Sequence, residues 1–150
     1  MFSIGRSKYA PGSVASFITS LIYVFFFNFR IDIIFLIILV SLIFIFSVYS
    51  IDKFQNSFEE IDSKEIVIDE FVGQSIPILT IYSFMSKNDV NSFILYVMIS
   101  FILFRFFDIV KPYPINRIDK LMKNGFGVML DDVIAGIYSS LILLVFFLLA

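Results

Sequence analysis

Residues 31–49, IDIIFLIILVSLIFIFSVY, decide the fold class of this chain. The stretch is almost wholly apolar, and its single charged residue is Asp32, close to its start. A helix of about 20 residues spans the ~30 Å hydrocarbon core of a membrane, and ~17 residues are enough. Residues 31–49 therefore predict a transmembrane helix.

Four more apolar stretches lie on either side of this one, at residues 13–29, 71–85, 90–110 and 133–150. Together they predict an all-α integral membrane protein, a single domain over residues 1–150 that forms a bundle of about five transmembrane helices. The stretches 13–29 and 71–85 are short for a complete crossing. Four crossings plus one re-entrant segment is therefore the alternative.

The composition agrees with a membrane protein and limits the chemistry. Hydrophobic residues make up 59% of the chain and charged residues 16%, with 21 Phe, against ~45–50% and ~25% in soluble domains. The chain has no Cys and no His, which excludes disulfides, thiol nucleophiles, histidine bases and Cys/His zinc sites. A net charge of −2 gives no basic field for nucleic acid.

Positive charges predict the orientation in the membrane. With five crossings and a cytoplasmic N-terminus, nine of the eleven Lys and Arg residues fall on the cytoplasmic side, and only Arg30 and Lys87 fall outside. The nine are Arg6, Lys8, Lys53, Lys64, Arg105, Lys111, Arg117, Lys120 and Lys123. Because cytoplasmic loops are enriched in Lys and Arg, the split predicts that Ala150 lies outside.

Ionisable residues at the rims of three apolar segments form the candidate site. They are Asp69 and Glu70, then Arg105, Asp108 and Lys111, then Asp131 and Asp132. Charges at membrane segments are costly and are functional candidates by default. The predicted topology brings all three groups to the cytoplasmic face, where hard oxygen ligands suit Mg²⁺ and the cations suit a phosphorylated ligand.

Each group also has a purely structural interpretation. Asp131-Asp132 and Asp69-Glu70 could each begin a helix, where the helix dipole favours negative charge. Arg105 and Asp108 could form an ion pair between residues three apart on one helix. We expect Gly125-Phe126-Gly127 to form a flexible turn before the last helix, and Lys111-Pro112 to end the fourth.

Elimination narrows the enzymatic options further. Lipid phosphatases that use histidines are excluded, and the D-G-x₂-A-R string of CDP-alcohol phosphotransferases is absent. A Mg²⁺ site of carboxylates acting on a phosphomonoester remains, with Asp69, Glu70, Asp108, Asp131 and Asp132 as ligands. Arg105 and Lys111 would bind the phosphate.

The same motifs resemble those of the phosphatidylglycerophosphatase A family. The family's D-E-F-x-G segment is present at residues 69–73, although Ile68 stands where the family usually has Trp. Its F-R-x-x-D-x-x-K-P-x-P-I-x-x-x-D segment matches from Phe104 to Asp119, and its G-x-G-x-M-x-D-D-x-x-A-G segment from Gly125 to Gly136. Pro11-Gly12 begins a softer match to P-G-T-x-G-S, so that the resemblance extends over residues 5–140.

The resemblance implies a Mg²⁺-dependent enzyme of the bacterial inner membrane. Such an enzyme removes the terminal phosphate of phosphatidylglycerophosphate at the cytoplasmic face, in phospholipid biosynthesis. The alternative is a small transporter or channel with an acidic ion site, whose carboxylates would be spread through the membrane depth. A non-catalytic membrane subunit is a third interpretation, which the full acidic set disfavours.

Overall fold

A computed structural model describes residues 11–54, 67–86, 88–122 and 124–149, and these form six helices. The helices are α1 (Pro11–Asn28), α2 (Ile33–Phe54), α3 (Ile68–Phe84), α4 (Val90–Val110), α5 (Ile115–Leu121) and α6 (Gly125–Leu149). No strand occurs within the described ranges. Arg6, Lys8, Lys64, Lys87 and Lys123, which enter the topology prediction, lie outside those ranges.

The predicted all-α membrane fold is confirmed. Among the described helices, α1, α2, α4 and α6 are long and apolar enough to cross a membrane. Helix α3 has only 17 residues and contains Pro77, so its complete crossing stays a prediction. Large apolar side chains cover the outside of the bundle, for example Phe46 and Ile102, as expected for surfaces that face lipid.

Helix α3 lies at the centre of the bundle and contacts α1, α2, α4 and α6. Its buried Gln74 donates a hydrogen bond from Nε2 to Ser100 Oγ of α4, at 3.1 Å. Gly73 of α3 and Gly136 of α6 face each other so closely that a Cβ on Gly136 would overlap the Gly73 carbonyl oxygen. Small residues at such crossings let membrane helices pack backbone to backbone.

Helix α4 ends where the proline pair predicts. Lys111 follows its last residue in the left-handed conformation (φ 44°) and donates its N–H to the Phe107 carbonyl at 2.9 Å. Pro112 cannot continue a helix. The chain then turns into the short helix α5.

The predicted start of the last helix, and with it the flexible turn at 125–127, is wrong. Helix α6 begins at Gly125, and Asn124 Oδ1 accepts the Gly127 N–H at 2.8 Å as an N-cap. The glycines serve close packing, since a Cβ on Gly125 would lie 2.6 Å from the Val48 carbonyl oxygen. Asp131 and Asp132 consequently lie beyond the first turn of α6.

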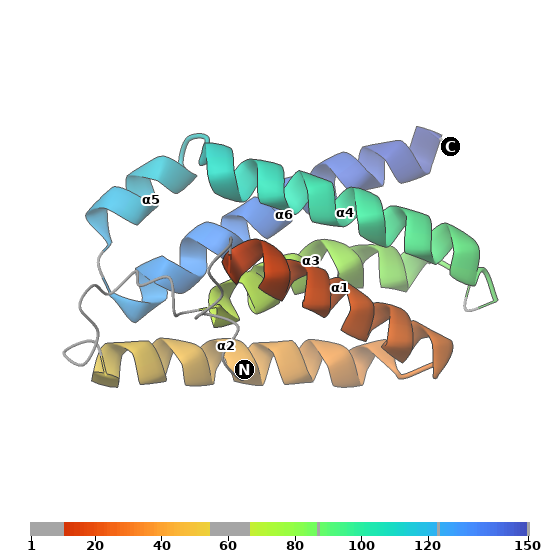
Figure 1. Ribbon diagram of the computed structural model, residues 1–150, viewed down its shortest axis with the longest axis horizontal. Helices are drawn as coiled ribbons and strands as arrows, with labels where there is room; N and C mark the ends of the chain where they lie inside the picture. Colours follow the sequence, from red (N-terminus) through yellow and green to blue (C-terminus); the bar gives the residue numbers. More distant parts are fainter. Residues whose placement is uncertain (1–10, 55–66, 87, 123, 150) are drawn as a thin grey trace.

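The helices alternate in direction. Figure 1 shows that α3 and α6 start, and α2 and α4 end, towards the left end of the bundle, where α5 also lies. The C-terminal part of α6 is at the opposite end. The three charged groups predicted from the sequence therefore come together at one end.

Candidate functional site

Asp69, Glu70 and Asp132 form a three-carboxylate cluster where α3 begins beside α6. One carboxylate oxygen from each lies within 4.8 Å of the other two. Asp69 and Asp132 are buried, and Glu70 is half-buried. Gly73 allows the close approach, since a Cβ there would lie 2.9 Å from the Cβ of Asp132 and 2.8 Å from its carbonyl oxygen.

Two oxygens of this cluster lack a partner. Glu70 Oε2 and Asp132 Oδ2 are buried and make no hydrogen bond within the described part of the chain. Buried polar atoms are normally satisfied, and three carboxylates packed together repel one another unless a cation or protons intervene. Oxygen ligands of this kind suit Mg²⁺ or Ca²⁺. The cluster can therefore hold a hard divalent cation.

Arg105 and Asp108, in the last two turns of α4, lie next to the cluster. Arg105 Nη1 is 2.6 Å from Asp108 Oδ2, and Asp108 in turn interacts with Asp132. Arg105 also lies against α1, because a Cβ on Gly12 would be 3.1 Å from Arg105 Nη1 and would overlap Glu70 Oε1. The start of α1 thus forms one wall of the site.

Lys111 holds a second group of carboxylates together. Its Nζ is 2.8 Å from Asp119 Oδ1 of α5 and 2.8 Å from Asp131 Oδ2 of α6. Burial alone would lower the pKa of Lys111, but the hydrogen bonds and charges of Asp119 and Asp131 outweigh it, so that the pKa is raised. The ammonium stays protonated and ties α4, α5 and α6 together.

The predicted site residues are therefore neighbours, but they fall into two groups. Asp69, Glu70 and Asp132 form the three-carboxylate cluster, and Asp108 and Arg105 lie next to it. Lys111 and Asp131 belong to the ion bridge with Asp119. Their assignment to phosphate and to metal stays a prediction.

The structure also separates the structural interpretations. Asp69 and Glu70 do lie in the first turn of α3, where the helix dipole favours them. Asp131 and Asp132 do not lie in the first turn of α6, so helix capping fails to explain them. The ion pair between Arg105 and Asp108 is present at the predicted spacing.

Sequence reasoning did not assign three residues at this end of the bundle. Gly12 contacts Glu70 and Arg105, Asp119 pairs with Lys111, and Gln74 is fully buried one turn after Glu70. The Pro11-Gly12 motif was the available signal for Gly12. For Asp119 the signal is its fixed position, with Lys111, in the segment from Phe104 to Asp119, although the fold of that turn decides whether the two side chains meet.

Comparison with known proteins shows what the chain as a whole is similar to. The sequence profile of the phosphatidylglycerophosphatase A family matches residues 1–147. A protein of Bacteroides thetaiotaomicron, provisionally named a phosphatidylinositol-3-phosphatase, is 34% identical over 147 residues, which cover 96% of this chain and 87% of the relative.

Two further relatives carry the name phosphatidylglycerophosphatase A. The protein of Haemophilus influenzae is 38% identical over 106 residues, or 71% of this chain and 60% of the relative. That of Escherichia coli is 37% identical over 82 residues, or 55% of this chain and 43% of the relative. No solved structure matches the chain significantly.

Proposed function

The chain belongs to the phosphatidylglycerophosphatase A family, a family of phosphatases, and we propose that it hydrolyses the terminal phosphomonoester of phosphatidylglycerophosphate. The products would be phosphatidylglycerol and phosphate. One observation carries the proposal, namely three carboxylates within 4.8 Å of one another beside the half-buried Arg105. Such a site combines ligands for a cation with a group that recognises phosphate.

Mg²⁺ is the proposed cofactor. Asp69, Glu70 and Asp132 would hold it, and the unpartnered Glu70 Oε2 and Asp132 Oδ2 supply oxygens that now lack any other described partner. Bound there, the ion would neutralise phosphate charge and lower the pKa of a water molecule. Asp108, which Arg105 holds in place, interacts electrostatically with Asp132 and would help to position that carboxylate.

Arg105 is the proposed phosphate-binding residue. Its Nε and Nη1 are buried without a hydrogen bond in the described ranges, although Nη1 lies 2.6 Å from Asp108. A guanidinium presents two parallel N–H groups that match two phosphate oxygens. Gly12, with no side chain, lets the side chains of Glu70 and Arg105 lie directly against α1.

The sequence also predicts that Lys111 binds phosphate. An ammonium has three donors, and the carboxylates of Asp119 and Asp131 engage it at 2.8 Å each. The contacts favour a role in which Lys111 fixes Asp131 beside the cluster, with phosphate contact as an additional role.

The charge distribution supports the membrane location and argues against a transporter. The carboxylates gather at one end of the helix bundle, and the predicted topology makes this end cytoplasmic (Figure 1). A transporter with an acidic ion path would need charged groups through the membrane depth. We place the enzyme in the bacterial inner membrane, acting on lipids of the cytoplasmic leaflet.

The relative from Bacteroides raises a second lipid, phosphatidylinositol-3-phosphate, for the same chemistry. Both candidates are phosphomonoesters on a phospholipid head group. The geometry of the carboxylates and Arg105 recognises the phosphate they share. The choice between them therefore needs a direct assay.

The test is phosphate release by the purified protein in detergent from each of the two lipids, with Mg²⁺ or with EDTA. We expect Mg²⁺-dependent release, faster from phosphatidylglycerophosphate. Asp89→Asn is the matched control, because Asp89 caps α4 through the Ser92 N–H, and Asn caps equally well. Faster release from the inositol lipid would show that phosphatidylinositol-3-phosphate is the better substrate. Release unaffected by EDTA would show that the reaction does not need a divalent cation.

A further inference from the structure

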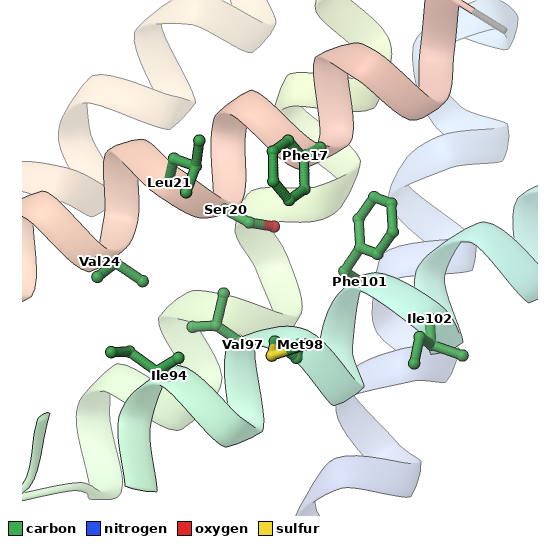
Figure 2. Close-up of a pocket in the computed structure, with 9 residues that line it drawn as sticks. All are labelled: Phe17, Ser20, Leu21, Val24, Ile94, Val97, Met98, Phe101 and Ile102. Carbon is green, nitrogen blue, oxygen red and sulfur yellow. The ribbon is translucent and has the colours of Figure 1, made fainter. Parts of the chain in front are cut away.

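An apolar groove lies between α1 and α4 (Figure 2). Its volume is about 380 Å³, within the ~300–1,000 Å³ range of ligand pockets. It extends from Phe17 to Val24 on α1 and from Ile94 to Ile102 on α4. Figure 2 shows the two helices side by side, with the side chains of both arranged around the groove.

The side chains that line the groove are almost all apolar. Ser20 is the one polar residue among those that line it. Its hydroxyl donates to the Ser16 carbonyl at 3.0 Å and accepts from Gln74 Nε2 at 3.4 Å, so its polar atom is engaged within the protein. A polar ligand would find no hydrogen-bond partner in the groove, whereas an alkyl chain needs none.

One end of the groove lies near the candidate site. Phe17 follows Gly12 by five residues, about one and a half helical turns, and Phe101 precedes Arg105 by four, about one turn. The rings of Phe17 and Phe101 meet edge to face, with centroids 6.1 Å apart, at the end nearest the site. From there the groove continues to Val24 and Ile94, towards the other end of the bundle. The same two helices therefore carry both the phosphate-facing residues and the groove.

We propose that this groove holds one acyl chain of the phospholipid substrate and thereby sets the depth at which the head group meets Arg105. The inference rests on the proposed function and extends it to the lipid chain. The groove and the site share α1 and α4, and the lining residue Phe101 lies about one helical turn from Arg105, which argues for the substrate's own chain as the occupant.

Such a groove would act by positioning the substrate in the active site. A chain that leaves lipid for an apolar groove gains little free energy of transfer, because lipid tails are as apolar as the groove. What it gains is a fixed orientation of the phosphate relative to the catalytic groups, and small misplacements of a substrate cost large factors in rate. The groove should therefore affect turnover of long-chain lipids and be irrelevant to lipids too short to enter it.

Val24→Trp tests this by filling the far end of the groove, about 18 Å along α1 from Gly12. Val145→Trp is the matched control, because Val145 lies outside the groove on the lipid-facing side of α6, at a comparable distance from Asp132. Phosphate release is measured from dihexadecanoyl and from dibutanoyl phosphatidylglycerophosphate in the same detergent.

We expect Val24→Trp to lower kcat/KM for the long-chain lipid about tenfold relative to the short-chain lipid. Val145→Trp should leave that ratio unchanged. An unchanged ratio in folded Val24→Trp protein would overturn the proposal.

A second measurement does not depend on activity. Phosphatidylglycerol with a photoreactive acyl chain should label wild-type peptides of α1 and α4 that line the groove, and Val24→Trp but not Val145→Trp should reduce this labelling. If wild-type protein hydrolyses neither lipid, the proposed function fails while the labelling still decides the groove. Labelling confined to other helices, or a dimer in detergent that Val24→Trp dissociates, would show a different occupant and overturn the proposal.

Discussion

Arg105 Nη1 lies 2.6 Å from Asp108 Oδ2 in the last two turns of α4, yet Nη1 and Nε make no hydrogen bond in the described part of the chain. A half-buried guanidinium whose buried Nε has no acceptor has capacity for a further anion. The pair is therefore incomplete as a structural ion pair and suited to receive a phosphate.

Arg105→Lys separates these two roles. Lys keeps the charge but loses the bidentate geometry, so we expect turnover to fall roughly tenfold to a hundredfold with little change in thermal stability. Activity and the melting temperature in detergent are measured on the same preparation. Arg30→Lys is the control, because Arg30 contacts Asn88 at the loops away from the site. If the variant is less stable but each folded molecule keeps its activity, Arg105 has a structural role and does not bind phosphate.

Lys111→Met tests the ion bridge. The change leaves Asp119 and Asp131, which are each 2.8 Å from Nζ, without their shared cation, and Asp131 is largely buried. Removing one partner of a mostly buried pair costs about 2–3 kcal/mol, so we expect the melting temperature to fall by several degrees. Lys120→Met, at an exposed position of α5, should change it little. Equal melting temperatures for the two variants would contradict the bridge.

The fold class and the convergence of the charges were accessible from sequence. Apolar stretches of membrane length predict helices whatever their packing, and the Lys and Arg distribution predicts which ends share a side. The start of α6 was not accessible, because Gly125 and Gly127 are typical of a turn. They belong to the helix because Val48 and Met122 pack against the positions their Cβ atoms would occupy.

The division of the site residues into the carboxylate cluster and the ion bridge could not be predicted from the sequence either. Asp131 and Asp132 are adjacent in sequence, but the helix directs Asp132 into the three-carboxylate cluster and Asp131 towards Lys111. Sequence motifs supply both residues without saying which faces α3. Only the packing of α6 on α3 at Gly73 and Gly136 decides that.

Gly73→Ala tests this packing. The added methyl group would lie 2.8 Å from the Asp132 carbonyl oxygen and 2.7 Å from the ring of Phe104, so α3 and α6 must separate. Overpacking of this kind costs about 1–3 kcal/mol, and we expect both a lower melting temperature and a loss of activity, because Asp132 moves. Val145→Ile adds a methylene group on the lipid-facing surface and should alter neither. Full activity in Gly73→Ala would show that the close approach does not matter.

The topology predicts that the C-terminus is outside the cytoplasm. The C-terminal part of α6 is at the end of the bundle opposite the carboxylates (Figure 1), and nine of eleven Lys and Arg residues are assigned to the carboxylate side. Alkaline phosphatase fused after Ala150 should be active, and green fluorescent protein fused there should not fluoresce. The reverse pattern would place both ends of α6 differently and make α1 or α3 re-entrant.

Asp132→Asn tests the metal through stability as well as activity. In the absence of Mg²⁺ the substitution removes one of three crowded carboxylates, so the metal-free variant should be at least as stable as the metal-free wild type. A cation that binds only the folded protein raises its stability with concentration, by about 2.7 kcal/mol at 100 times its Kd. Wild-type protein should therefore melt at a higher temperature as Mg²⁺ is added.

Asp132→Asn should lose most of this Mg²⁺-dependent increase together with its activity. Asp89→Asn, at the cap of α4, should keep both. Asp131→Asn distinguishes the two carboxylate groups, because its contact with Lys111 lies outside the three-carboxylate cluster. It should keep a larger share of the Mg²⁺ stabilisation than Asp132→Asn does, while its metal-free melting temperature falls. An equal Mg²⁺-dependent increase in melting temperature in wild type and Asp132→Asn would show that the cation does not bind at the three-carboxylate cluster.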